Sequence, residues 1–215
     1  MTEQQTAFWD MISIFENEGL LPYVMLIGSW AEYIYQHHLD SGFQANLRTR
    51  DVDFLYPNIN KPQNREISLT KSMREKGFIY VEDRLSGVGK FIKEDFLELE
   101  FITRALGKGK PVNKIPILNI NAEGLREVNM LASYPLVVDC NNYSITVPEP
   151  EAYILQKLFA YPTRKPAYKK AKDIQAVKEL INHINIDRLK EIYDGMPKKT
   201  QRIVGETQAE HFINF

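Results

Sequence analysis

The sequence predicts an α/β (α+β) protein in which a mixed β-sheet with flanking helices is followed by a C-terminal helical region. Two observations predict this class. Up to about residue 147, apolar runs of strand length and period-2 alternation are interleaved with helical periodicity. Beyond Pro148 and Pro150 every segment has helical periodicity. We therefore expect an α/β domain over 1–147 and a helical region over 148–215.

Each element of the first half follows from its local pattern and its turn residues. In chain order, the predicted elements are helix 8–19, strand 23–27, helix 30–37, strand 51–56, helix 66–76, strands 78–81, 91–92 and 96–102, helix 125–131, and strands 136–138 and 143–147. The last two strands are joined by Asn141-Asn142, which is typical of a hairpin turn. In the second half, helices are predicted over 153–160, 169–183, 186–193 and 201–204.

Composition and charge exclude several classes of protein. The 215 residues are 44% hydrophobic and 26% charged, which is ordinary for a globular chain. The formal net charge of -1 provides no overall attraction to nucleic acid or acidic membranes. The longest apolar run is 24–27, far below the roughly 20 residues that cross a bilayer, so we expect no membrane partner. Residues 1–5 do not resemble a signal peptide and Cys140 stands alone, so we expect a cytoplasmic protein without disulfides.

Acidic residues on two predicted strands form the first candidate site. Asp51 and Asp53 are two residues apart on a strand and therefore share one face. Glu98 and Glu100 are placed in the same way on a later strand, and either could supply a third carboxylate. Mg²⁺ binds carboxylate oxygens together with substrate phosphate, so these acids indicate a divalent cation site. A pair of acids that solvates the end of a strand would have the same pattern.

A glycine-serine turn favours the interpretation of these acids as a functional site. Gly28-Ser29 stands where a predicted strand passes into a helix, 22 residues before Asp51. Glycine lets the backbone approach a phosphate, and a following helix directs N–H groups towards an anion. An ordinary turn with an N-cap is the alternative. In this order, a phosphate cradle, two metal-binding aspartates and a third acid compose a phosphoryl-transfer site.

The motifs resemble those of the nucleotidyltransferase fold in the DNA polymerase β superfamily. The second half adds a more specific resemblance. Lys157-Leu158-Phe159-Ala160, followed by Arg164 and then Lys172-Asp173, resembles the K-L-x-A-x-x-x-R and R-D-x-x-D-L motifs of AbiEii-type nucleotidyltransferases, with Lys172 in place of arginine. AbiEii-type proteins are toxins of type IV toxin–antitoxin and abortive-infection systems. The resemblance covers four short motifs within residues 24–178.

The resemblance implies a role for each motif. Gly28 and Ser29 would contact the triphosphate of an NTP. Asp51 and Asp53 would bind Mg²⁺ or Mn²⁺, and Glu100, preferred to Glu98, would be the third carboxylate. The implied reaction transfers NMP from an NTP to a hydroxyl on an RNA end or a protein, and an antitoxin protein would be a partner.

In the second half, the resemblance implies that Lys157, Arg164, Lys172 and Asp173 bind the nucleotide. From composition alone, Lys157 could equally be a half-exposed surface lysine. Five positive charges fall between 164 and 172, and they would serve either a polyanion or a solvated helix face. A catalytically silent nucleotide-binding or regulatory module of the same fold is the alternative function, although intact aspartates favour catalysis.

Overall fold

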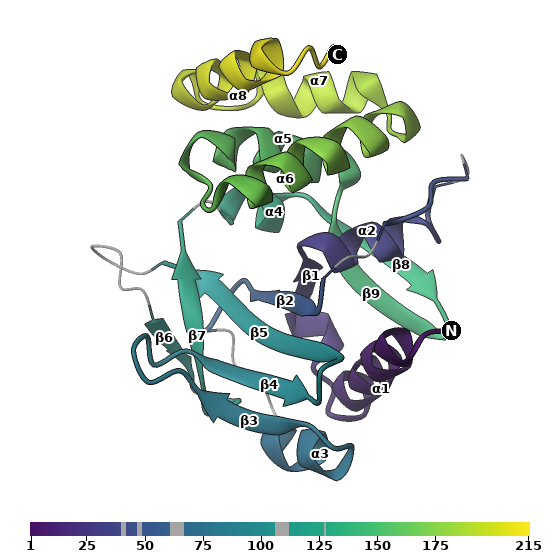
Figure 1. The fold of residues 1–215 in the computed structure, drawn as a ribbon, viewed down its shortest axis with the longest axis vertical. Coiled ribbons are helices and arrows are strands. Elements are labelled where there is room, and N and C mark those ends of the chain that lie inside the picture. The colour runs from purple at the N-terminus through teal and green to yellow at the C-terminus, as the bar shows by residue number, and fades with distance from the viewer. Residues whose placement is uncertain (40–41, 47–48, 61–66, 106–111, 127) are drawn as a thin grey trace.

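The structure is a computed structural model that describes residues 1–39, 42–46, 49–60, 67–105, 112–126 and 128–215. Within these residues, a mixed seven-stranded sheet and a two-stranded hairpin are combined with helices (Figure 1). The sheet strands are β1 (Met25–Ile27), β2 (Asp51–Tyr56), β3 (Ile79–Glu82), β4 (Gly89–Lys93), β5 (Leu97–Arg104), β6 (Val112–Ile115) and β7 (Ile120–Leu125). The hairpin strands are β8 (Pro135–Cys140) and β9 (Tyr143–Pro148).

The sheet is centred on β2 and β5, which pair in parallel. β1 pairs with β2 antiparallel, and β4 and β3 extend the other side of β5, giving the order β1-β2-β5-β4-β3. β7 joins the end of β5 in parallel and carries β6 at its outer edge. In this topology, side chains from the start of β2, the middle of β5 and the second half of β7 lie on one face of the sheet.

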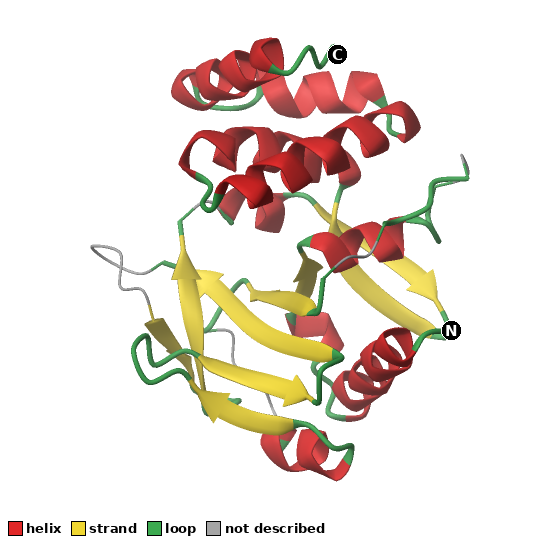
Figure 2. Ribbon diagram, viewed as in Figure 1, coloured by secondary structure: helices red, strands yellow, loops and turns green. Residues whose placement is uncertain are grey.

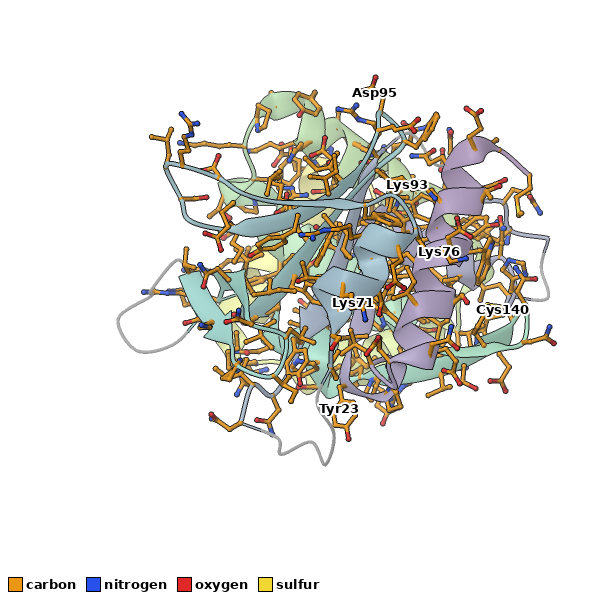
Figure 3. The ribbon with its side chains drawn as sticks, turned by 90° about the horizontal axis from the view of Figure 1, so that it is seen from below. Tyr23, Lys71, Lys76, Lys93, Asp95 and Cys140 are labelled. Atoms are coloured by element: carbon orange, nitrogen blue, oxygen red, sulfur yellow. The ribbon has the colours of Figure 1, made fainter. Side chains whose placement is uncertain are left out.

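The α1 helix (Glu3–Asn17) covers the opposite face of the sheet. It begins with a capping box in which Thr2 and Gln5 exchange side-chain and backbone hydrogen bonds. Its buried side packs Phe15 at 4.9 Å from the Phe54 ring. At the edge of this contact, Lys93 of β4 pairs with an aspartate of α1, and Figure 3 shows Lys93 beside that helix.

The α2 helix (Ser29–Tyr35) follows β1 directly after Gly28. Trp30 is completely buried, and its ring stacks on Phe8 of α1 with 4.3 Å between centroids. Its indole Nε1 has no hydrogen-bond partner among the described residues. The α2 helix is therefore fixed to α1 through an aromatic contact at its first turn.

The β8–β9 hairpin turns at Asn141 and Asn142, whose φ angles of 48° and 67° are both left-handed. Asparagine tolerates this region better than most residues, and two such residues in a two-residue loop match the twist of a hairpin. Cys140 next to the turn is buried, and burial raises the pKa of its thiol to about 11 (Figure 3). The predicted hairpin is confirmed.

The C-terminal helices form a separate layer at one end of the molecule, shown in red above the yellow strands in Figure 2. They are α5 (Pro150–Ala160), α6 (Ala167–Leu180), α7 (Ile186–Asp194) and α8 (Lys198–Glu210). Of these, α5 and α6 lie nearest the sheet (Figure 1). Arg188 of α7 binds both carboxylate oxygens of Glu149 at 2.8 and 2.9 Å, which fixes α7 to the start of α5.

The remaining helical elements are short: α3 (Leu69–Glu75), α4 (Asn129–Ser133) and the 3₁₀ turns Leu21–Tyr23, Tyr161–Thr163 and Ile181–His183. The main apolar core runs without interruption from α1 through the sheet to the C-terminal helices. A smaller core, which includes Ile27, Leu55 and Leu131, packs α4 against the sheet face that carries the acids. No helix among the described residues has both the length and the apolar character of a membrane-spanning segment.

The predicted fold class is confirmed, but one predicted helix is wrong. The structure forms β6 and β7 before residue 126, and only Asn129–Ser133 is helical where a helix over 125–131 is predicted. Strand pairing overrides the local pattern here, because Ile120 and Ala122 alternate into the core. The predicted helix 66–76 begins at Leu69, and its first residue lies outside the described part of the chain.

Candidate active site

The predicted acids lie together on one sheet face. Because β2 and β5 are parallel and in register, Asp51 is opposite Glu98 and Asp53 is opposite Glu100. Between the aspartates, Val52 points to the other side and is fully buried. The predicted alternation is therefore correct, and it places four carboxylates on two adjacent strands.

Gly28 lies directly against this acidic face. A Cβ atom at Gly28 would be 2.8 Å from Oδ2 of Asp53, and the φ angle of +69° is left-handed. Both the close approach and the φ angle require glycine. The predicted turn between strand and helix is thus built around contact with the second aspartate, and Ser29 follows as the first residue of α2.

Asp53 occupies an electrostatically unfavourable position for a carboxylate. Burial, followed by the nearby Glu100 and Asp51, raises its pKa to about 7, while Arg164 opposes the shift. A positive charge placed among these acids would relieve their mutual repulsion.

Glu98 and Glu100 differ in what they contact. Lys90 of β4 lies between them, with Nζ at 2.5 Å from Glu100 and 3.9 Å from Glu98. Glu98 also pairs with Arg50 at 3.2 Å. Only Glu100 of the two lines the cleft described next, so the structure favours it as the acid that faces a substrate.

A cleft of about 500 Å³ lies between the sheet and the C-terminal helices. It is lined by every predicted site residue except Glu98, namely Gly28, Ser29, Asp51, Asp53, Glu100, Lys157, Arg164, Lys172 and Asp173. We call Asp51, Asp53, Glu100 and Glu123 the sheet wall, and Lys157, Arg164, Lys172 and Asp173 the helix wall. The sheet wall is acidic and the helix wall is mainly basic, and the two walls come from residues more than 30 positions apart in the chain.

The helix wall is organised around Asp173 of α6. Lys157 of α5 contacts one carboxylate oxygen of Asp173 at 2.7 Å, and Arg164 contacts the other at 3.0 Å. Lys157 is 8% exposed and Asp173 is 5% exposed, so Lys157 is not a half-exposed surface lysine. One buried carboxylate thus holds two of the predicted nucleotide-binding cations beside the cleft.

The cations of the basic segment between 164 and 172 face in different directions. Lys172 points into the cleft, and burial lowers its pKa, although the nearby Glu32 opposes that shift. Lys169 also lines the cleft. Lys170 instead lies over the ring of Tyr161 and contacts the Pro162 carbonyl at 3.3 Å. The segment therefore combines a surface that faces the cleft with an ordinary outer face.

Sequence reasoning missed two residues behind the helix wall. The Tyr153 hydroxyl lies 2.5 Å from Oε1 of Glu32 and 3.1 Å from the carbonyl oxygen of Gly28. Burial raises the pKa of Glu32, and Lys157 at 3.9 Å opposes that shift. Glu32 gave no local signal, because a single acid on a predicted helix is usually exposed. Tyr153 gave no signal, because an aromatic residue on a helix is usually part of the core.

Glu123 was also missed, because its segment was not predicted to be a strand. Pairing of β7 with β5 brings Glu123 opposite Ile102 and into the cleft. Burial raises the pKa of Glu123, and Glu100 adds to the shift. The sheet wall therefore contains an additional carboxylate.

The acids of the sheet wall suit a hard divalent cation by donor type. No group of three or more His, Cys, Asp or Glu side chains in the described ranges is already arranged to hold a metal ion. Glu100 is engaged by Lys90, so it would have to turn towards Asp53 to share an ion. Burial is the main cause of the raised pKa of Asp53, and its acidic neighbours Glu100 and Asp51 add to it. The residues thus fit Mg²⁺ or Mn²⁺ as ligands.

An acidic wall opposite a basic wall, with a glycine turn between them, defines a protein that can bind a polyphosphate beside carboxylates. Comparison with protein families makes the class specific. Residues 7–198 match a family described as nucleotidyltransferase. The chain therefore belongs to that nucleotidyltransferase family.

Solved structures show the same fold at low sequence identity. An antigenic nucleotidyltransferase-like protein from Paracoccidioides brasiliensis is similar with a TM-score of 0.55 and 14% identity, over 94% of this chain and 88% of the other. ANT(2″)-Ia in complex with adenylyl-2″-tobramycin is similar with a TM-score of 0.52 and 12% identity, over 98% and 99%. No curated protein matches the sequence significantly. These comparisons do not show the AbiEii-type resemblance.

Proposed function

We propose that this protein is a metal-dependent nucleotidyltransferase that transfers NMP from an NTP to a hydroxyl acceptor. The proposal rests on one observation. Asp51, Asp53 and Glu100 lie together on one wall of a cleft, and the other wall carries Lys157 and Arg164. Membership of a nucleotidyltransferase family supports the reaction class.

In this proposal the two walls have different tasks. Lys157, Arg164 and Lys172 bind the triphosphate, while Gly28 and Ser29 let the backbone approach it. Asp51, Asp53 and Glu100 hold Mg²⁺ or Mn²⁺, which supplies positive charge to the phosphate oxygens when bound. The walls thus orient the α-phosphate above the acids of β2 and β5.

The reaction follows from this orientation. The acceptor oxygen attacks the α-phosphorus in line with the leaving group, and a new P–O bond forms. The bond between the α-phosphorus and the bridging oxygen breaks, and pyrophosphate leaves with that electron pair. Glu100 takes the proton of the acceptor hydroxyl.

The class of acceptor is a separate part of the proposal. The motif resemblance of residues 147–178 supports an AbiEii-type toxin that acts on an RNA end or a protein, with an antitoxin as partner. ANT(2″)-Ia, in contrast, forms a complex with an adenylylated small molecule, adenylyl-2″-tobramycin. A small-molecule hydroxyl is therefore the second acceptor class to test. We retain the cytoplasm as the proposed location and residues 148–215 as a proposed helical unit.

A transfer assay tests the proposal directly. The protein is incubated with each α-³²P-labelled NTP, with Mg²⁺ or Mn²⁺, and with total RNA, lysate protein or a small-molecule extract. We expect label in one acceptor fraction and none with Asp51→Asn/Asp53→Asn, while Asp194→Asn on the exposed side of α7 keeps full activity. Transfer that persists in the double variant would contradict the assignment of these acids.

The same double variant has a second readout. Mg²⁺ with NTP should raise the melting temperature of the wild type, because a ligand that binds only the folded state stabilises it by mass action. The metal-dependent part of that rise should disappear in the double variant. A silent nucleotide-binding module would show the rise without any transfer of label.

A further inference from the structure

The hydroxyl of Tyr153 occupies a position that the proposed reaction does not yet use. Tyr153 is 2% exposed on α5, one helical turn before Lys157, whose Nζ lies 4.7 Å from the Tyr153 ring centroid. The hydroxyl reaches the backbone of Gly28, 125 residues earlier in the chain. The α5 helix therefore carries the buried lysine and also contacts the glycine turn.

The contact with Gly28 constrains a particular peptide group. The carbonyl of Gly28 and the N–H of Ser29 belong to one trans peptide, and in a trans peptide these two groups point in opposite directions. Tyr153 holds the carbonyl at 3.1 Å, so the Ser29 N–H points away from Tyr153. Ser29 lines the cleft, and its N–H makes no hydrogen bond to any described residue.

We propose that Tyr153 is a positioning residue that fixes the Gly28–Ser29 peptide so that the Ser29 N–H is presented to a phosphate of the bound NTP. The proposal rests on the proposed nucleotidyl transfer for the identity of the anion. The Gly28 carbonyl also accepts the first backbone hydrogen bond of α2, from the Ala31 N–H at 3.1 Å, so Tyr153 is a second donor that holds this peptide from the side of α5.

Glu32 contacts the same hydroxyl. A tyrosine hydroxyl has one proton, and it lies within reach of two acceptors, Oε1 of Glu32 at 2.5 Å and the Gly28 oxygen at 3.1 Å. Both contacts are satisfied together when Glu32 carries a proton and donates to the tyrosine oxygen. Burial raises the pKa of Glu32, which is consistent with this arrangement.

Tyr35 provides a matched control. Its hydroxyl is also buried and donates to a backbone carbonyl, that of Pro148, at 2.8 Å. Its ring lies 5.7 Å from that of Tyr153. Tyr35→Phe therefore removes a buried hydrogen bond of the same kind from the same region without changing the contact with Gly28. Tyr153→Phe keeps the ring beneath Lys157 and removes only the hydroxyl.

The experiment combines calorimetry with NMR on the full chain. ATP and the other three common NTPs are titrated with Mg²⁺ into the wild type, Tyr153→Phe and Tyr35→Phe, and the Ser29 amide ¹⁵N shift is recorded without nucleotide. We expect Tyr153→Phe to weaken NTP binding about tenfold, the scale of one lost hydrogen bond to a charged ligand, and Tyr35→Phe to change it less than about twofold. The Ser29 shift should move in Tyr153→Phe and stay constant in Tyr35→Phe.

Glu32→Gln keeps the test decisive if Tyr153→Phe does not fold. The amide N–H of this variant can donate to the Tyr153 oxygen as protonated Glu32 does, so the hydroxyl should still donate to Gly28. We expect the Ser29 shift to stay close to that of the wild type, with NTP affinity within about threefold of wild type.

The outcomes separate the two proposals. Equal affinities and equal Ser29 shifts in Tyr153→Phe and Tyr35→Phe would overturn the positioning role and leave nucleotidyl transfer intact. A Glu32→Gln variant whose Ser29 shift moves away from wild type, or whose NTP affinity falls by more than about threefold, would also overturn it. A wild type that binds none of the four NTPs would contradict the proposed function itself, and the positioning role with it.

Discussion

The two walls of the cleft carry opposite charges and differ in how those charges are balanced. On the helix wall, Asp173 pairs with Lys157 and Arg164, so part of the positive charge of that wall is balanced within the protein. On the sheet wall, Asp53 lies opposite Glu100, and its pKa is raised mainly by burial and further by its acidic neighbours. Asp173 is paired with two cations, whereas no cation pairs with Asp53 among the described residues.

This difference indicates which wall depends more on what binds there. A paired wall can be ordered before substrate arrives, whereas a wall of like charges is completed by a cation. We therefore expect substitutions on the sheet wall to affect activity more than folding. Substitutions on the helix wall should affect both.

The largest effect should separate the two glutamates of β5. Glu100→Gln should lower the transfer rate about 100-fold or more while NTP affinity changes little, because the acid acts on the attacking hydroxyl. Glu98→Gln is the matched control, since Glu98 pairs with Arg50 and does not itself line the cleft, and this substitution should lower the transfer rate less than about fivefold. Single-turnover rates measure both, and a greater loss in Glu98→Gln would reverse the assignment.

A smaller effect on binding, joined to an effect on stability, is expected from Lys157→Ala. Loss of one charge-assisted hydrogen bond should weaken NTP binding by about 1.5–3 kcal/mol. Because Lys157 is buried against Asp173, its removal should also lower the free energy of unfolding by about 3 kcal/mol. Calorimetric titration and urea unfolding test the two parts, with the exposed Lys190→Ala as control. Unchanged stability would mean that the helix wall does not depend on this pair.

The smallest expected effect is a gain in stability rather than a loss. The raised pKa of Asp53 in the folded protein means that its contribution to stability is full below about pH 4 and is lost as the pH rises towards 7. In EDTA at pH 8, Asp53→Asn should therefore be more stable than wild type by about 1–3 kcal/mol, and the gain should vanish at pH 4. Urea unfolding at the two pH values measures this. A variant less stable than wild type at pH 8 would show that the sheet wall is balanced without a cation.

The local sequence pattern predicts the two aspartates of the sheet wall, whereas the helix wall is predicted only through the motif resemblance. Period-2 alternation places Asp51 and Asp53 on one face without further information, and the structure agrees. Glu98 and Glu100 have the same alternation, so only the positions of Lys90 and the cleft distinguish them. That distinction depends on tertiary contacts that no local pattern records.

Residues of the network behind the helix wall could not be predicted from local sequence. Glu32 and Tyr153 lie on different helices, 121 positions apart, and each fits an ordinary helical pattern. Glu123 was missed for another reason, because β7 is stabilised by pairing with β5 and β6 and its local pattern does not indicate a strand. The motif resemblance located Lys157 and Asp173, but their contact with each other required the structure.

The stacked indole of Trp30 gives the Ser29 turn an optical readout. Trp30 is bonded directly to Ser29, and it is sealed against Phe8 with its Nε1 unpartnered among the described residues. Indole emission responds to the polarity and mobility of its surroundings, so any movement of this turn changes the environment of a chromophore already in place. The other tryptophan, Trp9, contacts the Tyr33 hydroxyl at 3.4 Å, and Trp9→Phe would leave Trp30 as the single emitter. Events at the glycine turn can then be followed by fluorescence in real time, without a label on protein or nucleotide.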